Sequence, residues 1–202
     1  MKDNWFKKWF NTCDYLELYD HRNNADAKKI VSLISKTLKL PGGSKLLDLA
    51  CGNGRHSVFF AERGYDVLGI DLSPFLIAEA NKKLRSDYRD YRKNLRFEIG
   101  DMRRIYQKSE FDLVVNLFSS FGYFDNDREN ISVVRSISES IKDNGYFFFD
   151  FLNSVYLRKH LQTFDIKKRN RKIIFQVREI AGKYVKKSIA IAGCTCVSDY
   201  PE

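Results

Sequence analysis

Residues 46–57 have the sequence LLDLACGNGRHS, and the prediction of the fold starts from this stretch. An apolar run containing Asp48 leads into Gly52 and Gly54, which allow the backbone to turn tightly. A helix-like segment follows from Arg55, and the first backbone N–H groups of a helix have no partner inside the helix. The stretch therefore predicts a strand, a glycine turn and a helix that together surround a small ligand.

Strand-like and helix-like segments alternate along the chain. The apolar periodicity predicts helices after Asn24, over 55–63, from Ser73-Pro74 toward Tyr91 and over 131–141, and strands over 45–49, 66–70, 95–99, 111–118 and 145–152. Parallel neighbours need right-handed helical crossovers, so this order predicts a doubly wound, mostly parallel, Rossmann-like α/β sheet with at least five core strands. Such sheets bind ligands at the carboxyl ends of their strands.

The pattern changes outside this core. Residues 154–162 suggest one more helix, and residues 172–193 alternate polar and apolar side chains around a glycine turn, which predicts a small antiparallel β appendage. We expect three regions: an N-terminal helical lid segment (1–40), a Rossmann-like core (41–153) and a basic antiparallel β lid or substrate subdomain (154–202).

The composition of the chain limits the classes of protein to which it can belong. The chain has 202 residues, 44% of them hydrophobic, which is enough for a packed core. It has no apolar stretch near the about 18 residues of a membrane span, no export signal, and no metal-binding spacing among its four cysteines. We therefore expect a cytoplasmic protein with no metal and no membrane contact.

The positive charge is concentrated near the C-terminus. Residues 151–202 contain 11 Lys and Arg against 4 Asp and Glu, and the whole chain has a net charge of +9. Runs such as 167–169 and 171–172 could contact a polyanion such as RNA. A solvated face of exposed strands is the simpler interpretation.

Carboxylates mark the ends of three successive predicted strands. Asp48 lies near the end of the first strand, Asp71 closes the second and Asp101 follows the third. A carboxylate in the position of Asp71 can accept hydrogen bonds from both hydroxyls of a ribose. The three acids suit a ligand with a ribose, an exocyclic amine and a positive centre.

Phosphate-binding motifs fit the glycine turn less well. A P-loop would continue with Gly-Lys-Ser/Thr, where this chain has Gly54, Arg55 and His56. A dinucleotide motif would have a third glycine in place of Ser57, and Asp48 would bring negative charge next to a pyrophosphate. S-adenosylmethionine carries a sulfonium and an ammonium and no phosphate, so it fits better. A dinucleotide-dependent oxidoreductase remains a further alternative.

The chain resembles the class I S-adenosylmethionine-dependent methyltransferases in four segments: DLACGNGRHS (48–57), GYDVLGIDLSP (64–74), GDM (100–102) and NLFSSFGYF (116–124). The resemblance is closest to the small-molecule branch, which carries an antiparallel β lid after the fifth strand. It implies that S-adenosyl-L-methionine is the cofactor and that the fold is Rossmann-like.

The resemblance also implies roles for individual residues. The loop before Gly54 would surround the methionine part of the cofactor, Asp71 would hold the ribose, and Asp101 would bind the adenine edge. The implied cofactor contacts are Tyr19, Arg22, Asp48, Ala50, Cys51, Gly52, Asn53, Gly54, Asp71, Leu72, Ser73, Asp101, Met102, Asn116, Leu117 and Phe118. The resemblance also implies that Asn116 lines the transfer site. The candidate catalytic residues are His21, Asn116 and Tyr123, where His21 and Tyr123 are candidates for a base because we expect them to face the mouth of the site.

The expected acceptor is a small molecule. Amino-methylating nucleic-acid enzymes of this fold carry a Pro-Pro-aromatic box after the fourth strand, and cytosine enzymes carry Pro-Cys, whereas residues 116–119 are Asn-Leu-Phe-Ser. A small-molecule acceptor is therefore favoured over nucleic acid. The alternative is a weakly active or inactive S-adenosylmethionine-binding protein with a basic face for a partner or RNA.

The fifth strand raises the question of a homodimer. Proteins of this family usually continue past the lid to complete a seven-stranded sheet, whereas five core strands are visible here. A fifth strand at an open sheet edge presents unpaired backbone groups, and these could pair with a second copy of the chain.

Overall fold

The computed structural model describes residues 5–19, 24–124, 126–169, 171–182 and 184–193. These residues form two compact units. The first unit comprises the described residues among 1–11 and 22–151, and the second comprises those among 12–21 and 152–202.

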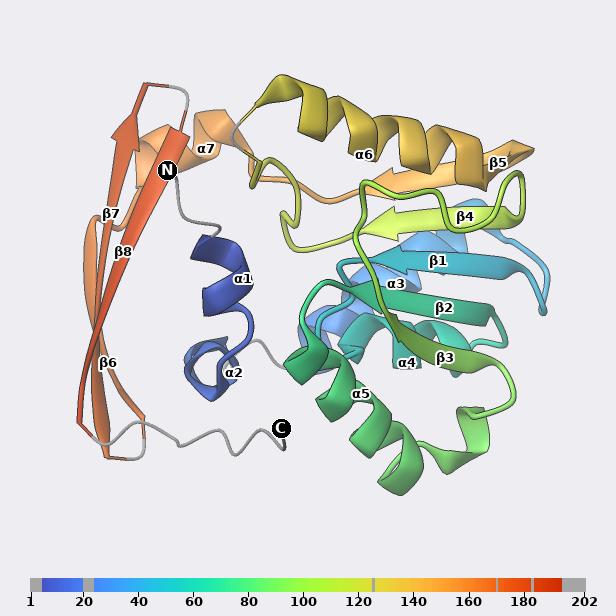
Figure 1. The fold of residues 1–202 in the computed structure, drawn as a ribbon, viewed down its shortest axis with the longest axis horizontal. Helices are drawn as coiled ribbons and strands as arrows, with labels where there is room; N and C mark the ends of the chain where they lie inside the picture. Colours follow the sequence, from blue (N-terminus) through green and yellow to red (C-terminus); the bar gives the residue numbers. More distant parts are fainter. Residues whose placement is uncertain (1–4, 20–23, 125, 170, 183, 194–202) are drawn as a thin grey trace. The chain divides into compact units, whose positions relative to one another are not determined.

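The first unit is built around a parallel sheet (Figure 1). Its strands β1–β5 lie in the order β3-β2-β1-β4-β5, and each neighbouring pair is parallel. The strands are β1 (Lys45–Leu49), β2 (Asp66–Asp71), β3 (Leu95–Ile99), β4 (Phe111–Asn116) and β5 (Ile141–Phe149). The helices are α1 (Trp5–Trp9), α3 (Asn24–Leu38), α4 (Arg55–Ala61), α5 (Pro74–Ser86), the short 3-10 helix η1 (Arg89–Tyr91) and α6 (Asp127–Ser140).

Helices cover both faces of this sheet. One core cluster joins the sheet to α3, α4 and α5 and includes Val31, Phe60 and Ile77. The other core cluster joins it to α6 and includes Val133 and Ile137. Parallel sheets bury both faces in this way. The predicted doubly wound, Rossmann-like α/β fold with at least five core strands is confirmed.

Several predicted element ends were wrong, including those of the helix predicted over 55–63, which ends at Ala61, and of the strand predicted over 145–152, which ends at Phe149. The helix that begins at Pro74 ends at Ser86, because the carbonyl of Lys83 accepts the N–H groups of both Asp87 and Tyr88 and closes the last turn. β4 ends at Asn116, and Phe118 already has a left-handed backbone with φ of 61°. The segment over 141–149 is one strand with a bulge, so Ile141 belongs to β5 and not to α6.

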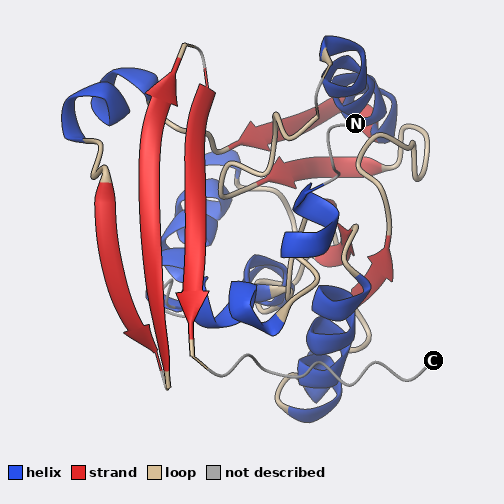
Figure 2. Ribbon diagram, turned by 60° about the vertical axis from the view of Figure 1, so that its left-hand side comes forward, coloured by secondary structure: helices blue, strands red, loops and turns tan. Residues whose placement is uncertain are grey.

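The second unit contains a three-stranded antiparallel sheet, which Figure 2 shows as three long neighbouring strands. The predicted hairpin is confirmed as the pair β7 and β8, and the predicted helix as α7. β6 was not predicted, because its sequence FDIKKR holds two apolar residues and four charged ones. The elements are α2 (Cys13–Tyr19), α7 (Ser154–His160), β6 (Phe164–Arg169), β7 (Lys172–Ala181) and β8 (Tyr184–Ala192).

Apolar surface is concentrated at β5, the last strand at one end of the parallel sheet. Tyr146, Phe147 and Phe149 are each more than 40% exposed, and the rings of Phe147 and Phe149 stack at 5.7 Å. Whether a second copy pairs with this edge stays a prediction. Among the described helices, none has the length and apolar composition that crossing a membrane requires.

Two glycines in the turn between β1 and α4 differ in the space around them. Gly52 and Gly54 both have positive φ, of 58° and 79°. A Cβ on Gly52 would meet no atom within 4 Å, whereas a Cβ on Gly54 would lie 2.3 Å from Cζ of Phe97. Both positions favour glycine for its backbone freedom, but Gly54 is also needed for packing.

We therefore expect Gly54→Ala to lower the free energy of unfolding by about 1–3 kcal/mol more than Gly52→Ala does. Both variants bear the cost of a left-handed alanine, so the difference between them isolates the clash with Phe97. Urea unfolding of the two variants measures it. Equal losses would show that Phe97 moves aside without cost and would contradict this account of the turn.

Candidate functional site

The turn after β1 folds back over the end of β2. The N–H of Cys51 donates to the carbonyl of Ile70 (2.9 Å), and the N–H of Gly54 donates to the carbonyl of Cys51 (3.1 Å). Ala50 adopts a left-handed backbone with φ of 59°, which is uncommon for a residue with a side chain. These bonds fix the turn at the carboxyl end of the sheet, where the sequence predicts a ligand site.

Asp48 is a buried acid beneath this turn. Its side chain is 1% exposed, and its Oδ2 accepts a hydrogen bond from Oγ of Ser57 at 2.6 Å. Burial raises the pKa of Asp48 to about 7, and the nearby charge of Asp71 acts in the same direction, while the Ser57 bond opposes both. Asp48 is therefore set to gain or lose its proton near neutral pH.

Asp71 ties the turn to the end of β2. Its Oδ2 accepts the backbone N–H of Gly52 and its Oδ1 accepts that of Ser73, each at 2.9 Å. Burial raises the pKa of Asp71, and the backbone bonds to Ser73 and Gly52 partly offset this effect. A carboxylate oxygen has more than one lone pair, so both oxygens retain capacity for a further donor.

The other predicted contacts differ in how far they are buried. Cys51 is buried, and burial raises the pKa of its thiol well above the ordinary value, so it is unreactive. Leu117 is also buried, whereas Leu72 and Met102 pack against the core with one part of each side chain still exposed. Asn53 is partly exposed in the turn.

Asp101 is engaged by an arginine that the sequence analysis did not consider. The guanidinium Nε of Arg103 lies 2.9 and 3.1 Å from the two carboxylate oxygens of Asp101. Arg103 also bonds to Glu129 of α6 and lies over the ring of Phe124. Burial would raise the pKa of Asp101, but the hydrogen bonds and charge of Arg103 outweigh burial and lower it. A ligand at Asp101 would therefore share its carboxylate with Arg103.

Asn116, at the end of β4, has a buried acceptor atom. Its Nδ2 lies 3.2 Å from the carbonyl oxygen of Leu49 and 3.4 Å from that of Ser120. Its Oδ1 is buried and accepts no hydrogen bond from any residue that the structure describes. A buried acceptor without a donor costs free energy, so this atom favours a ligand that brings a donor.

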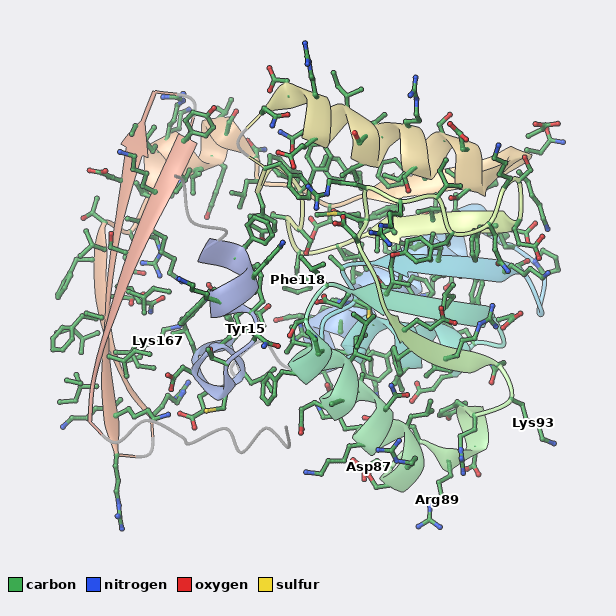
Figure 3. All side chains as sticks on the ribbon, viewed as in Figure 1. Tyr15, Asp87, Arg89, Lys93, Phe118 and Lys167 are labelled. Carbon is green, nitrogen blue, oxygen red and sulfur yellow. The ribbon has the colours of Figure 1, made fainter. Side chains whose placement is uncertain are left out.

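The loop after β4 is held by Asp150, which the sequence analysis missed. Its Oδ2 accepts the N–H of Phe118 at 2.9 Å, and its backbone carbonyl accepts the N–H of Ser119 at 3.0 Å. Figure 3 labels Phe118, whose ring lies 4.9 Å from the His56 ring and 4.9 Å from the guanidinium carbon of Arg55. The available signal was a carboxylate directly after the FFF run of the fifth strand, as at the ends of the other strands.

Phe10 and Asn11 contact this end of the sheet. Oδ1 of Asn11 accepts the N–H of Phe75 at 3.1 Å and lies 2.9 Å from Oγ of Ser73. Ser73 also caps α5, because its Oγ accepts the N–H of Leu76. The ring of Tyr123 packs edge-on against Phe10 at 5.5 Å. Asn11 was not predicted as a site residue, since a lone asparagine between helices carries no pattern.

Three predicted contacts come from the N-terminal lid segment. Tyr19 belongs to the second unit, where its hydroxyl accepts a hydrogen bond from Nζ of Lys187 at 2.8 Å. His21 and Arg22 lie outside the described residues. The roles of all three stay predictions.

Asp48 should make the free energy of unfolding fall as the pH rises from about 4 to about 7. Within this window the folded chain keeps a proton on Asp48 that the unfolded chain, with an ordinary pKa of 3.8, has already lost. Asp48→Asn keeps an acceptor for Ser57 and should remove this component of the slope. Denaturant unfolding of both proteins across the pH range checks this, and parallel profiles would contradict the buried acid.

Residues 46–145 match the family model of the methyltransferase domain. The chain is 32% identical over 121 residues to dTDP-3-amino-3,4,6-trideoxy-alpha-D-glucopyranose N,N-dimethyltransferase of Streptomyces venezuelae, covering 60% of this chain and 47% of that protein. The chain spans about half the length of the curated relatives that it matches.

Solved structures show the same fold. An S-adenosylmethionine-dependent methyltransferase from Clostridium acetobutylicum ATCC 824 superposes with a TM-score of 0.67 at 18% identity, over 92% of this chain and 82% of that one. An amino pentose methyltransferase from Micromonospora echinaspora, solved with S-adenosylmethionine bound, has a TM-score of 0.62 at 19% identity, over 92% and 83%. Residues 46–145 therefore form a methyltransferase domain, and the fold is that of the class I enzymes that use S-adenosylmethionine.

Proposed function

We propose that the protein transfers a methyl group from S-adenosylmethionine to an amine of a small polar molecule. The observation that carries the cofactor assignment is the pair of buried acids, Asp48 and Asp71, on either side of the turn at Gly52. Two buried carboxylates repel a phosphate and favour a ligand with positive charge and hydroxyl donors.

The residues around the turn suit the separate parts of the cofactor. Asp48 would hold the ammonium, because a cation next to a buried acid favours its charged form. Asp71 would accept the ribose hydroxyls with the capacity that Gly52 and Ser73 leave. The partly exposed side chains of Leu72 and Met102 would pack on the adenine.

The open space at Gly52 supports the same assignment. A Cβ there would meet no atom within 4 Å, so the backbone of the turn is accessible to a ligand. Asp101 fits less simply, because it would have to serve an adenine amine while it remains paired with Arg103. The Met102 backbone would carry more of the adenine recognition.

S-adenosylmethionine, when bound, would supply a methyl group on a sulfonium: an in-line nucleophile would take the methyl group while the carbon–sulfur bond breaks and the neutral thioether leaves. The protein then has to orient the acceptor and exclude water. Oδ1 of Asn116 would accept a hydrogen bond from the acceptor amine and so turn its lone pair toward the methyl group. His21 and Tyr123 remain the proposed groups for the proton that the amine releases.

The choice of an amine rests on relatives. The Streptomyces relative is named as an N,N-dimethyltransferase of an amino sugar nucleotide, and the Micromonospora structure as an amino pentose methyltransferase. Oδ1 of Asn116, which has no donor among the residues that the structure describes, supports an N–H donor in the same position, although a hydroxyl donor fits there as well.

A set of small amines, each paired with the analogue that has a hydroxyl in place of the amine, tests this proposal. We expect methyl transfer from S-adenosylmethionine to amines and not to their hydroxyl partners, detected by mass spectrometry of the acceptors. The exposed-surface variant Asp87→Asn serves as a control that should keep full activity. Transfer to hydroxyl analogues alone would contradict the amine assignment.

A further inference from the structure

The loop after β4 contains two successive residues with a strained backbone. Phe118 and Ser119 both adopt left-handed conformations, with φ of 61° and 58°. This conformation costs free energy in a residue with a side chain, so it persists only where surrounding contacts hold it. The loop directly follows Asn116, whose buried Oδ1 is assigned to the acceptor in the proposed function. The contacts that hold the loop therefore bear on the transfer site.

Asp150, the residue after β5, supplies three of these contacts. Its Oδ2 accepts the N–H of Phe118 at 2.9 Å, and its backbone carbonyl accepts the N–H of Ser119 at 3.0 Å. Its own N–H donates to the carbonyl of Asn116 at 3.0 Å. Any residue except proline could make the two backbone bonds, whereas the bond to Phe118 requires an acceptor on the side chain. The carboxylate of Asp150 is therefore specific to the strained part of the loop.

The loop returns Ser120 to the side chain of Asn116. Nδ2 of Asn116 lies 3.4 Å from the carbonyl oxygen of Ser120 and 3.2 Å from that of Leu49 in β1. Oγ of Ser120 donates to the carbonyl of Leu117 at 3.0 Å and closes the loop. Only the nitrogen end of an amide can donate to two carbonyls. These bonds therefore decide that the oxygen end, Oδ1, is the one left for a ligand.

We propose that Asp150 is a positioning residue for methyl transfer: its carboxylate holds the left-handed loop, and the loop orients the amide of Asn116 so that Oδ1 faces the acceptor. This inference rests on the proposed function, which assigns Oδ1 to the acceptor amine. Asp150 acts through Asn116 and contacts neither the methyl group nor the acceptor. Loss of its carboxylate would let the loop relax and would withdraw the Ser120 carbonyl from Nδ2.

Three variants separate this role from a general effect on stability. Asp150→Ala removes the side-chain acceptor, whereas Asp150→Asn keeps an acceptor oxygen in nearly the same place. Asp143→Ala makes the same chemical change at an exposed aspartate of β5 and is the matched control. Circular dichroism and urea unfolding verify that the variants are folded.

Hydrogen exchange followed by NMR measures the amide of Asn116 directly, and it needs neither cofactor nor acceptor. In the unaltered protein the hydrogens on Nδ2 should exchange slowly, because Nδ2 is held by two carbonyls. Asp150→Ala should speed their exchange, and that of the Phe118 N–H, about tenfold or more, the scale for losing a hydrogen bond to a charged group. Asp150→Asn should restore most of the protection. Asp143→Ala should change these rates by less than about twofold, as expected for an exposed side chain.

Turnover tests the functional part, with an amine that the unaltered protein methylates as the acceptor. Asp150→Ala should lower kcat about tenfold or more, because the acceptor is no longer oriented toward the methyl group. The dissociation constant of S-adenosylmethionine, measured by calorimetry, should change by less than about twofold, since Asp48 and Asp71 are unaltered. Asp150→Asn should recover most of kcat. A purely structural role would instead lower kcat and cofactor affinity together.

Two kinds of result would overturn the proposal. Unaltered exchange of the Asn116 amide in Asp150→Ala, or equal acceleration in Asp143→Ala, would show that the carboxylate of Asp150 does not orient this amide. Faster exchange with an unaltered kcat would show that the orientation of Asn116 does not affect transfer. A protein that methylates no amine would contradict the proposed function, whereas the exchange measurement separately decides whether Asp150 orients Asn116.

Discussion

The carboxylate of Asp71 is the interaction on which the rest of the site depends. Through Gly52 it fixes the turn after β1, and through Ser73 it fixes the start of α5. Ser73 in turn lies against Asn11, so the segment that contains Asn11 is joined to the same point. One buried acid thus positions three segments that are far apart in the sequence.

The same region contains groups that folding alone does not favour. Asp48 is buried with a pKa near 7, and Oδ1 of Asn116 is buried without a donor among the described residues. Both cost stability, because buried polar groups need partners. A cationic ligand with N–H donors would supply partners for both, which is why these two residues, and not the apolar core, carry the functional argument.

The sequence was sufficient to predict those elements whose local apolar pattern and residue chemistry agree. Apolar runs ending in Asp48 and Asp71 predicted the strands, and Gly52 and Gly54 predicted the turn, since few residues allow a positive φ. The sequence was insufficient to predict contacts between residues that are distant in the sequence. The FFF run before Asp150 marks it as a carboxylate at the end of a strand, but the sequence does not indicate that its side chain accepts the N–H of Phe118.

Contacts between residues distant in the sequence also explain the remaining differences between the predicted and the observed structure. The pairing of Asp101 with Arg103 is local, but the bond from Arg103 to Glu129 on α6 depends on the fold. β6 is a strand because β7 supplies its hydrogen-bond partners, from Phe164 with Val177 onward, and its own residues alone do not show this. Basic residues along β6 and β7 could be counted in the sequence, but only the register shows which of them share a face of the sheet.

Calorimetric titration with S-adenosylmethionine, and with NAD as the comparison, tests the central role of Asp71 most directly. The unaltered protein should bind S-adenosylmethionine and not NAD. Asp71→Asn should weaken that binding by about 1–3 kcal/mol, since it loses hydrogen bonds to a charged group. Asp87→Asn, an exposed carboxylate at the end of α5 labelled in Figure 3, should leave it unchanged. NAD binding in preference to S-adenosylmethionine, or an unaltered dissociation constant for Asp71→Asn, would contradict this account.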